Sequence, residues 1–346
     1  MKAELVRRDR GSADALTGAV LVADVRDSLG RVVLGRGTLV GDTERIVLEG
    51  MSWDTLHVIR PEPGDVVERE AGTRLAQASS GIGVRAGEGA GGHWPLVATS
   101  RGIVSVNREA LRTVNAGGDL AVYTLPDGQV VERDELVARA KIIPFVVDGD
   151  ALDRGLSAAT GVGGLVAVRP FVPARLGVVV LESLGSSALE RFQRALEEKA
   201  GWFGSTLLTP CVVARNARTI AVAMEGALAG DAGIVLVAGT TAMDPLDPAF
   251  EAIRLLGGRL ERVGVPAHPG SLLWLARINE VPVVGMPSCG LFSRATVFDL
   301  VLPRLLAGLA VDSSWLSELG HGGLLTRDVA ARFPPYRPRQ ERGAVD

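Results

Sequence analysis

The chain has 346 residues, of which 47% are hydrophobic and 22% charged, as expected for a globular protein of two or three domains. This composition excludes wholesale disorder, a coiled coil and a collagen-like fibre. Its 37 basic and 40 acidic residues give a formal net charge of −3. Such a balance argues against a nucleic-acid binder and against a polybasic membrane-surface protein.

Two cysteines, Cys211 and Cys289, are too few for a disulfide framework or a four-cysteine zinc site. A reducing cytoplasm is therefore the expected compartment. Residues 1–10 are too charged for a signal peptide, and no apolar run approaches the ~20 residues that span a bilayer. We expect a cytoplasmic protein that binds neither membrane nor nucleic acid.

The N-terminal part of the chain, residues 1–150, is predicted to be β-rich. Short strand-like runs at 20–22, 32–34 and 56–59 are separated by turns that contain Gly and Pro. One or two small barrels or sandwiches fit this spacing. The strand pattern is lost after residue 147, which indicates either the main domain boundary or the start of a linking helix, and we interpret 151–173 as a linker.

From residue 174 the pattern changes to alternating strands and helices. The continuous apolar runs at 177–181 and 233–238 are typical of strands covered on both faces. Apolar residues recur at helical spacing over 188–199. The alternation predicts an α/β domain over 174–310, with a mainly parallel open sheet flanked by helices. A C-terminal extension follows over 311–346.

Ligands of open α/β sheets bind outside the carboxyl ends of the strands, where this chain has three polar loops. The first loop (182–187) and the third loop (285–293) each precede a helix, whose free N–H groups favour anions. The second loop (239–247) carries Asp244 and Asp247, which could accept from amino groups or ribose hydroxyls, or bind Mg²⁺. A phosphorylated ligand rich in heteroatoms fits these three loops.

Each of these residues also has an ordinary structural explanation. Serine at a helix start, as at Ser187, is commonly an N-cap, and aspartate beside proline, as at Asp244, commonly stabilises a turn. Cys289 at a helix N-terminus could be a nucleophile, although an inert thiol is the more common case. The four histidines show no metal-binding spacing.

Four segments within 174–310, in matching order and spacing, resemble the molybdopterin-binding (MoaB/MogA) domain, as found in molybdopterin molybdotransferases of the MoeA and gephyrin E-domain type. Residues 238–247, AGTTAMDPLD, are similar to the SGGVSVGxxD loop of that family, with Asp247 at its acidic position. Residues 265–272 are similar to the MxPGKP segment, 283–290 to the VxGLPGNP turn, and 179–184 to the STGDEL segment. The β-rich N-terminal part also resembles MoeA-like proteins.

The chain departs from the family pattern at several of these positions. Thr240 replaces a glycine, Ser271 replaces the lysine of the PGK segment, and the PGNP turn becomes PSCG at 287–290. Ser183 replaces the acidic residue of TGDE, so that Glu182 is the nearest carboxylate. Loss of the lysine removes a charge that would meet phosphate or molybdate. The sequence therefore supports binding of a pterin better than molybdate transfer.

The resemblance implies a site for molybdopterin or its nucleotide form, with Mg²⁺ and molybdate as further ligands of an enzyme. Asp247, Asp244 and Glu182 would then be catalytic, and Asp244 and Asp247 would bind Mg²⁺. The residues expected to bind the cofactor are Ser183, Gly185, Ser186, Ser187, Gly239, Thr240, Thr241, Pro269, Gly270, Ser271, Pro287, Ser288, Cys289, Gly290 and Ser293.

Three functions remain open from the sequence. The first is a molybdenum cofactor biosynthesis enzyme, a transferase that inserts molybdate by positioning and charge neutralisation. The second is a non-catalytic molybdopterin carrier or accessory factor that serves a molybdenum hydroxylase. The third is a degenerate domain with an unrelated small ligand. The expected partners are the pterin, the apoprotein of a molybdenum enzyme and a second copy of the chain, with a dimer favoured.

Overall fold

The computed structural model describes five stretches of the chain: 1–8, 13–181, 185–286, 296–325 and 333–334. It consists of two compact units. Unit 1 comprises Met1–Ser100, Val104–Asp127 and Glu132–Arg169. Unit 2 comprises Arg101–Ile103, Gly128–Val131 and Pro170–Asp346. Among the described residues, no helix is both long enough and apolar enough to cross a membrane.

The strands up to Pro170 are short, as the dense turn signals predict. They are β1 (Lys2–Arg7), β2 (Val20–Leu21), β3 (Val25–Arg26), β4 (Val32–Leu34), β5 (Thr55–Arg60), β6 (Asp65–Val67), β7 (Val84–Ala86), β8 (His93–Ala98), β9 (Gly102–Val106), β10 (Leu120–Thr124), β11 (Val130–Val131), β12 (Leu136–Ile142), β13 (Val146–Asp148) and β14 (Val166–Pro170). The helices are the 3-10 helix η2 (Ala13–Leu16), α1 (Asp42–Glu49), α2 (Glu68–Ser79), α3 (Arg108–Asn115) and α4 (Gly149–Thr160).

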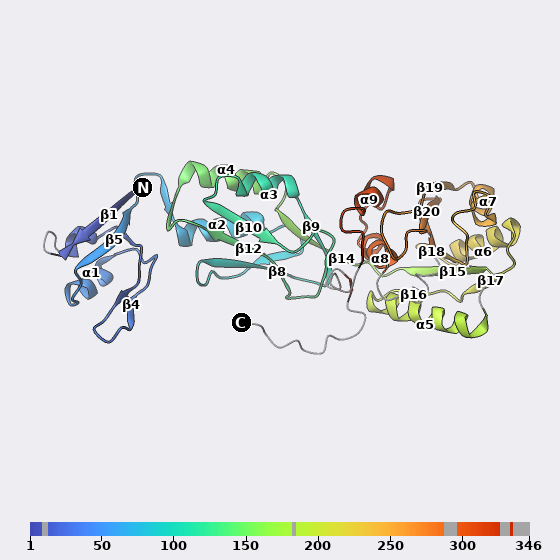
Figure 1. Cartoon of the computed structure of the whole chain (residues 1–346), viewed down its shortest axis with the longest axis horizontal. Helices are drawn as coiled ribbons and strands as arrows, with labels where there is room; N and C mark the ends of the chain where they lie inside the picture. Colours follow the sequence, from blue (N-terminus) through green and yellow to red (C-terminus); the bar gives the residue numbers. More distant parts are fainter. Residues whose placement is uncertain (9–12, 182–184, 287–295, 326–332, 335–346) are drawn as a thin grey trace. The chain divides into compact units, whose positions relative to one another are not determined.

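Two antiparallel sheets organise unit 1. Strands β1, β5 and β2 form the first, and β10, β12, β8 and β7 form the second (Figure 1). The first sheet encloses a small core that includes Leu16, Leu48 and Trp53. Helix α2 packs against β8 and β12 of the second sheet. Unit 1 thus has the predicted strands together with helices, two of which begin at side-chain caps, Asn107 for α3 and Asp148 for α4.

Unit 2 is built around one seven-stranded sheet with the order β16-β15-β18-β21-β20-β19, in which β17 also pairs with β15. Strands β16, β17 and β18 pair with β15 in parallel, as β21 does with β18, whereas β20 is antiparallel to β21 and β19. The strands are β15 (Arg175–Leu181), β16 (Thr206–Leu207), β17 (Cys211–Val213), β18 (Ile234–Ala238), β19 (Arg259–Val263), β20 (Trp274–Ile278) and β21 (Val281–Met286). The helices are α5 (Ser186–Trp202), α6 (Ala217–Ala229), α7 (Pro248–Leu255), α8 (Phe298–Leu306) and α9 (Ser313–Glu318).

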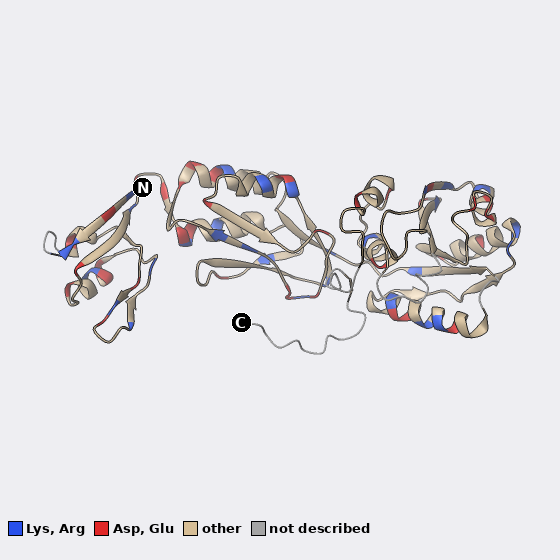
Figure 2. Ribbon diagram, in the orientation of Figure 1, with Lys and Arg blue, Asp and Glu red and all other residues tan. Residues whose placement is uncertain are grey.

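Alternation along β15 explains how this sheet is covered on both faces. Val178 and Val180 belong to a core shared with α5 and α8, and Val179 and Leu181 to a core shared with α6 and α7. Successive strand residues point to opposite faces, so a continuous apolar run serves both cores. The outer face of α5 carries interspersed acidic and basic side chains (Figure 2). The predicted mixture of sheets and helices is confirmed.

Candidate functional site

The pairing register of unit 2 brings the ends of three strands to one edge of the sheet. Val180 of β15 pairs with Ala238 of β18, and Ala238 pairs with Met286 of β21. All three strands are parallel, so their carboxyl ends, each of which precedes one of the three predicted loops, lie side by side. Glu182 and Ser183 of the first loop, and Pro287, Ser288, Cys289, Gly290 and Ser293 of the third, lie outside the described residues.

The fourth segment of the family pattern reaches the same edge from an antiparallel strand. Strand β20 starts at Trp274, which pairs with Gly285 near the end of β21. Only Leu272 and Leu273 separate the turn 269–271 from Trp274. Pro269, Gly270 and Ser271 therefore belong to the edge from which the second loop leaves.

Trp274 also connects this edge to the second loop. Its indole Nε1 donates a hydrogen bond of 3.0 Å to Oγ1 of Thr240. The ring lies against Gly285, where an added Cβ atom would approach its nearest ring atom to 1.9 Å. Gly285 is thus required for close packing of the indole, and the indole in turn fixes the side chain of Thr240.

Arg215, from the connection between β17 and α6, closes the second loop. Its Nη1 donates to the carbonyl oxygen of Gly239 at 2.8 Å. Its Nη2 donates to Oγ1 of Thr241 at 2.7 Å and to Oδ2 of Asp247 at 2.6 Å. The Arg215 side chain is 38% exposed, whereas Asp247 is only 1% exposed. A cation therefore lies partly open to solvent at the carboxyl edge, paired with a buried carboxylate.

The remaining hydrogen bonds of Asp247 are structural. Oδ2 also accepts from the backbone N–H of Thr241 at 2.6 Å, and Oδ1 accepts from the N–H of Ala249 at 2.9 Å. Asp247 is in this way the N-cap of α7, which has Pro248 in its first turn. Three donors thus reach this carboxylate, two of them on Oδ2, and the side chain is buried, so solvent and ions have little access to Asp247.

Asp244 lies in the same loop but has a different environment. Its side chain is exposed, and Oδ1 accepts from the N–H of Leu246 at 2.9 Å. The loop backbone is held by bonds from Asp244 N to Thr241 O (2.8 Å) and from Asp247 N to Asp244 O (3.0 Å). Within the described part of the chain, no three His, Cys, Asp or Glu side chains form a group that could hold a metal ion. Of the two aspartates expected to bind Mg²⁺, Asp244 is therefore open to solvent, whereas Asp247 is buried and paired with Arg215.

The start of α5 follows the first loop and is open to solvent. Gly185 is its N-cap, without a side-chain hydrogen bond, and Gly185, Ser186 and Ser187 are all exposed. Ser187 lies inside the first turn and is not the cap. Two hydroxyl groups and the first N–H groups of a 17-residue helix are thus available near the carboxyl edge.

The turn 269–271 packs against the residue that precedes α8. The N–H of Val297 donates to the carbonyl oxygen of Pro269 at 3.0 Å, and the peptide bond before Pro269 is cis. Gly270 has a φ of +114°, and a Cβ atom there would lie 3.0 Å from Val297. The family's glycine at this position is therefore required by this backbone. Ser271 is half-buried, and its carbonyl accepts from Val265 N–H.

Sequence reasoning did not identify Arg215 or Trp274 as part of this edge. A signal for Arg215 was available, because it follows a strand-like run (212–213) and precedes a helix, as the three predicted loops do. Trp274 gave no comparable signal, since its role depends on a strand pairing with Gly285.

No protein-family model matches the chain, and no curated protein matches it. Among solved structures, it is similar to a molybdenum cofactor biosynthesis protein from Pyrococcus furiosus, with 13% identity and a TM-score of 0.26. That match covers 89% of this chain and 64%, less than two thirds, of the other. It is also similar to the molybdopterin biosynthesis MoeA protein from Pyrococcus horikosii, with 13% identity, a TM-score of 0.30 and coverage of 89% and 75%.

A putative molybdenum cofactor biosynthesis protein from Corynebacterium diphtheriae has 17% identity and a TM-score of 0.27 over 40% of this chain and 100% of that chain. At TM-scores this low, the likeness by itself supports no function. The proteins found are nevertheless MoeA- and MoaB-type molybdenum cofactor biosynthesis proteins, the group that the sequence motifs resemble.

Proposed function

We propose that this chain binds molybdopterin, or its nucleotide form, at the carboxyl edge of the unit 2 sheet and acts in the synthesis or delivery of the molybdenum cofactor. The observation that carries this proposal is the strand register. It brings four segments that are up to about a hundred residues apart, and that resemble the family pattern, to one edge of one sheet.

The chemistry of this edge suits a phosphorylated pterin. Ser186 and Ser187 lie in the first turn of α5, where helix N–H groups favour a phosphate. Thr241 is exposed in the second loop. Backbone groups of such loops can hydrogen-bond the amide and amino groups of a pterin ring.

Arg215 supplies the positive charge that the family places on a lysine in the segment where this chain has Ser271. Its three hydrogen bonds to the second loop leave two of the roughly five N–H donors of a guanidinium for a ligand. An arginine held in this way is already oriented, so contact with an anion costs little side-chain entropy. We assign Arg215 to the phosphate or another anionic group of the ligand.

The surroundings of Asp247 favour a carrier over a molybdotransferase. Metal-assisted insertion of molybdate needs carboxylate oxygens that are free to bind Mg²⁺. The carboxylate of Asp247 is buried, carries three hydrogen bonds from Arg215, Thr241 and Ala249, and is paired with the Arg215 cation, which disfavours a second cation there. The carrier would pass the bound pterin to the apoprotein of a molybdenum enzyme, while molybdate insertion stays the second candidate.

Binding of molybdopterin to the purified full chain tests the proposal. Loss of a hydrogen bond to a charged group, about 1.5–3 kcal/mol, predicts that Arg215→Ala lowers affinity roughly 10- to 100-fold. Arg175→Ala is the matched control, because Arg175 is an exposed arginine at the opposite end of β15. Wild-type protein that does not bind molybdopterin, or equal affinities of the two variants, would contradict the proposed site.

A second measurement separates the carrier from the enzyme. The adenylated ligand is incubated with the chain, molybdate and Mg²⁺, and released AMP is measured. Binding without molybdate-dependent release of AMP supports the carrier. Release that depends on molybdate would establish the transferase and overturn our preference.

A further inference from the structure

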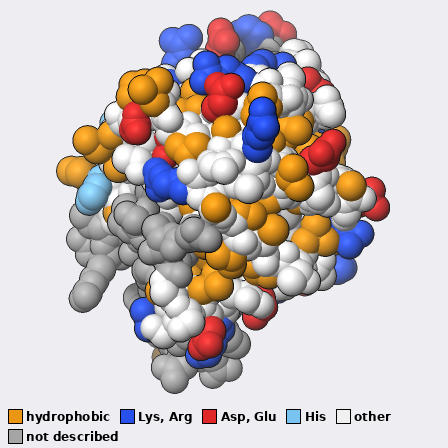
Figure 3. Space-filling view, turned by 90° about the vertical axis from the view of Figure 1, so that its right-hand side faces the viewer, with side chains coloured by type: hydrophobic (Ala, Val, Ile, Leu, Met, Phe, Trp, Pro, Cys, Tyr) orange, Lys and Arg blue, Asp and Glu red, His pale blue; other side chains and the backbone are white. Residues whose placement is uncertain are grey.

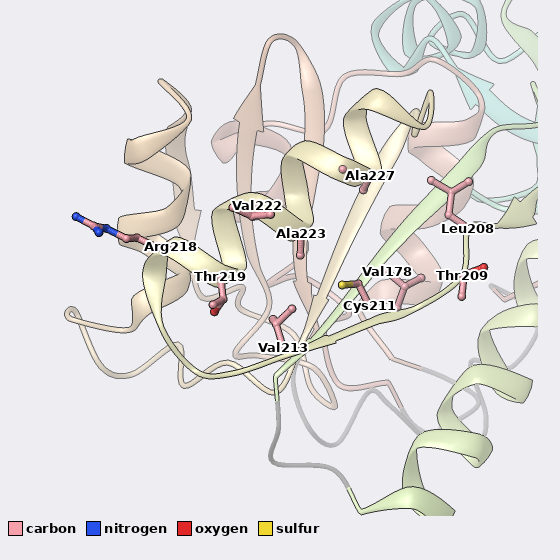
Figure 4. Close-up of a pocket in the computed structure, with 11 residues that line it drawn as sticks. Val178, Leu208, Thr209, Cys211, Val213, Arg218, Thr219, Val222, Ala223 and Ala227 are labelled. Atoms are coloured by element: carbon pink, nitrogen blue, oxygen red, sulfur yellow. The ribbon is translucent and has the colours of Figure 1, made fainter.

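Two cavities in the described part of the chain differ in what their walls offer a ligand. In unit 2, a groove of about 570 Å³ between α6 and the edge of the sheet is lined mainly by apolar groups (Figure 4). Seen from this end of unit 2, hydrophobic side chains reach the surface among charged residues of both signs (Figure 3). Apolar walls select no particular functional group, because burial of apolar surface is non-directional. The cavity in unit 1 is lined mainly by polar groups, which can be matched to the functional groups of a ligand.

The cavity of unit 1 has a volume of about 760 Å³, within the range of about 300–1,000 Å³ that small-molecule sites occupy. Helix α2 forms one side, with Glu68, Arg69 and Gln77, and the glycine-rich segment 86–94 forms the other. Glu88 of that segment is also acidic, so the lining contains charges of both signs. A ligand with a large net charge would be attracted by some of these groups and repelled by others. The lining therefore favours a neutral, polar ligand.

Glu68 is the group in this lining that most needs a partner. Its side chain is half-buried and, within the described part of the chain, it forms neither a hydrogen bond nor an ion pair. Burial raises the pKa of its carboxyl, against the opposing effect of Lys141, Arg36 and His93. A partly desolvated carboxylate without a donor is unfavourable, and a donor from a ligand would relieve that cost.

Gly92 leaves space in front of this carboxylate. A Cβ atom built on Gly92 would lie 2.7 Å from Oε1 of Glu68 and 3.6 Å from Nζ of Lys141. The φ of Gly92 is +76°, which glycine adopts without strain. The carboxylate and the ammonium thus both reach the place that a side chain would fill, yet among the described residues Glu68 has no ion pair with Lys141.

The group that fits between Glu68 and Lys141 must both donate and accept. An ionised carboxylate only accepts hydrogen bonds, and an ammonium only donates them. A cationic ligand group could not accept from Lys141, and an anionic group could not donate to Glu68. An amide donates and accepts through two separate atoms, whereas a single hydroxyl group does both. A hydroxyl group can therefore bridge the two charges.

We propose that this cavity binds a neutral polyhydroxylated ligand, either a sugar or the ribose of a nucleoside. One hydroxyl group of the ligand donates to Glu68 and accepts from Lys141. The Gln77 amide and the Arg69 guanidinium, which also line the cavity, serve its other hydroxyl groups. Acidic side chains bind ribose hydroxyls in the same manner in dinucleotide-binding folds. The site lies within unit 1 and does not depend on the function proposed for unit 2.

Matched ligands test the role of the hydroxyl group. Ligand-observed NMR with the full chain measures binding of D-ribose, adenosine and their deoxy counterparts (2-deoxy-D-ribose, 2′-deoxyadenosine and 3′-deoxyadenosine), at concentrations up to about 10 mM, since millimolar affinity suffices. At least one deoxy compound should bind about 10-fold or more weakly than its parent, because the hydrogen bond to Glu68 is then unmade. Binding of both parents indicates a sugar site, and binding of adenosine alone a nucleoside site. No binding of either parent, as expected of a cavity that holds only water, or equal binding of every deoxy compound, would overturn the proposal.

Variants of the two charged groups place the ligand in the cavity. Glu68→Gln keeps the shape of the side chain without its charge, and Lys141→Met removes the donor, so each should lower affinity about 10-fold or more. The matched controls are Glu70→Gln, exposed in the same turn of α2, and Arg139→Met, exposed on β12. Both controls should bind as the wild type does, and thermal unfolding checks that every variant is folded. Wild-type affinity in Glu68→Gln would overturn the proposal.

One further variant separates this site from the carboxyl edge of unit 2. Adenosine binding that is lost in Glu68→Gln and kept in Arg215→Ala supports the cavity of unit 1, whether or not the chain binds molybdopterin. Adenosine binding that is weakened by Arg215→Ala and unchanged in Glu68→Gln would belong to the carboxyl edge. That result would overturn the proposed sugar or nucleoside site and leave the function proposed for unit 2 intact.

Discussion

Two regions of unit 2 each hold a buried aspartate beside a cation, and they use it differently. At the carboxyl edge, Asp247 is paired with Arg215, whose side chain is 38% exposed. Between α5 and α8, Asp299 is paired with Lys199, whose side chain is only 9% exposed. The first cation remains accessible to a ligand, whereas the second is enclosed. A buried carboxylate is therefore no indication of a binding site unless its cation reaches the solvent.

The interior pair joins two helices that follow the first and the third loops. Oδ1 of Asp299 accepts from Nζ of Lys199, and Oδ2 accepts from the N–H and Oγ1 of Thr296 at 2.8 and 3.1 Å. Lys199 Nζ also lies 5.8 Å from the ring centre of Phe298. Asp299 thus fixes the chain just before α8 and ties that point to α5. Its contribution is to the geometry of the scaffold.

The largest effect is expected from breaking the interior pair. Asp299→Ala leaves the Lys199 ammonium buried without its carboxylate, which costs about 3–5 kcal/mol of unfolding free energy. Urea unfolding measures this loss. The double variant Lys199→Met/Asp299→Ala should recover part of it, because no charge is then buried. A loss below about 1 kcal/mol in the single variant would show that Lys199 reaches solvent after all.

Breaking the Arg215–Asp247 pair at the carboxyl edge should lower the free energy of unfolding by less than breaking the interior pair. Asp247→Ala removes the N-cap of α7 and the bond to Thr241, but Arg215 can be hydrated where it stands. We expect a loss of about 2–3 kcal/mol, from one cap and one charged hydrogen bond. Asp247→Asn, which keeps an oxygen for Ala249 N–H, should lose less. A loss equal to that of Asp299→Ala would mean that exposure of the cation does not separate the two regions.

Salt should distinguish the two pairs further. Arg215→Lys keeps the charge but loses the planar fork that contacts Gly239, Thr241 and Asp247, and we expect a loss of about 1 kcal/mol. Because the edge pair is partly hydrated, this loss should shrink between about 0.1 and 1 M salt, where the Debye length falls from ~10 to ~3 Å. The loss in Asp299→Ala should change little over the same range. If the stability losses of Arg215→Lys and Asp299→Ala depended equally on salt, the edge pair would not be more hydrated than the interior pair.

The sequence predicted the parts of this fold that depend on local pattern. Continuous apolar runs and helical repeats gave the alternation in unit 2, and the apolar run at 177–181 was correctly interpreted as a strand between two cores. The loops at the carboxyl edge followed from that alternation. The helix predicted from Ser293 begins, among the described residues, at Phe298. Its first described turn follows Thr296, whose bonds to Asp299 depend on side-chain geometry that no periodicity reports.

The roles of individual residues within the edge were harder to predict. Asp247 was identified by its place in a motif, but its partners, Arg215 and Ala249, are fixed by a pairing between distant segments and by a helix cap. An acidic residue at a ligand position and one that closes a loop look the same in a sequence. The two kinds of acidic residue differ in whether an arginine or lysine from a distant segment pairs with the carboxylate. Such an ion pair is a tertiary contact, which the local sequence does not report.

The smallest effect is expected in unit 1, where a half-buried carboxylate has no such cation. Glu68 lines a cavity of about 760 Å³ together with Arg69, Thr73 and Trp94, and forms no ion pair among the described residues. Burial raises the pKa of the Glu68 carboxyl above its usual value of 4.5, although Lys141, Arg36 and His93 oppose this rise. This carboxyl is thus the reverse of Asp247: it is partly desolvated without being paired.

A raised carboxyl pKa means that the folded state binds this proton more tightly than the unfolded state does. The resulting stability is fully present below the unfolded pKa and is lost as the pH rises through the folded pKa. Glu68→Gln should therefore gain stability relative to the wild type as the pH rises from about 4 to 7, by less than about 1 kcal/mol because the group is partly hydrated. Glu70→Gln, in the same first turn of α2, shares the helix dipole but is exposed, so it is the matched control. Urea unfolding at a series of pH values measures both. The same pH dependence in the two variants would show that the dipole of α2, and not burial, determines the pKa of the Glu68 carboxyl.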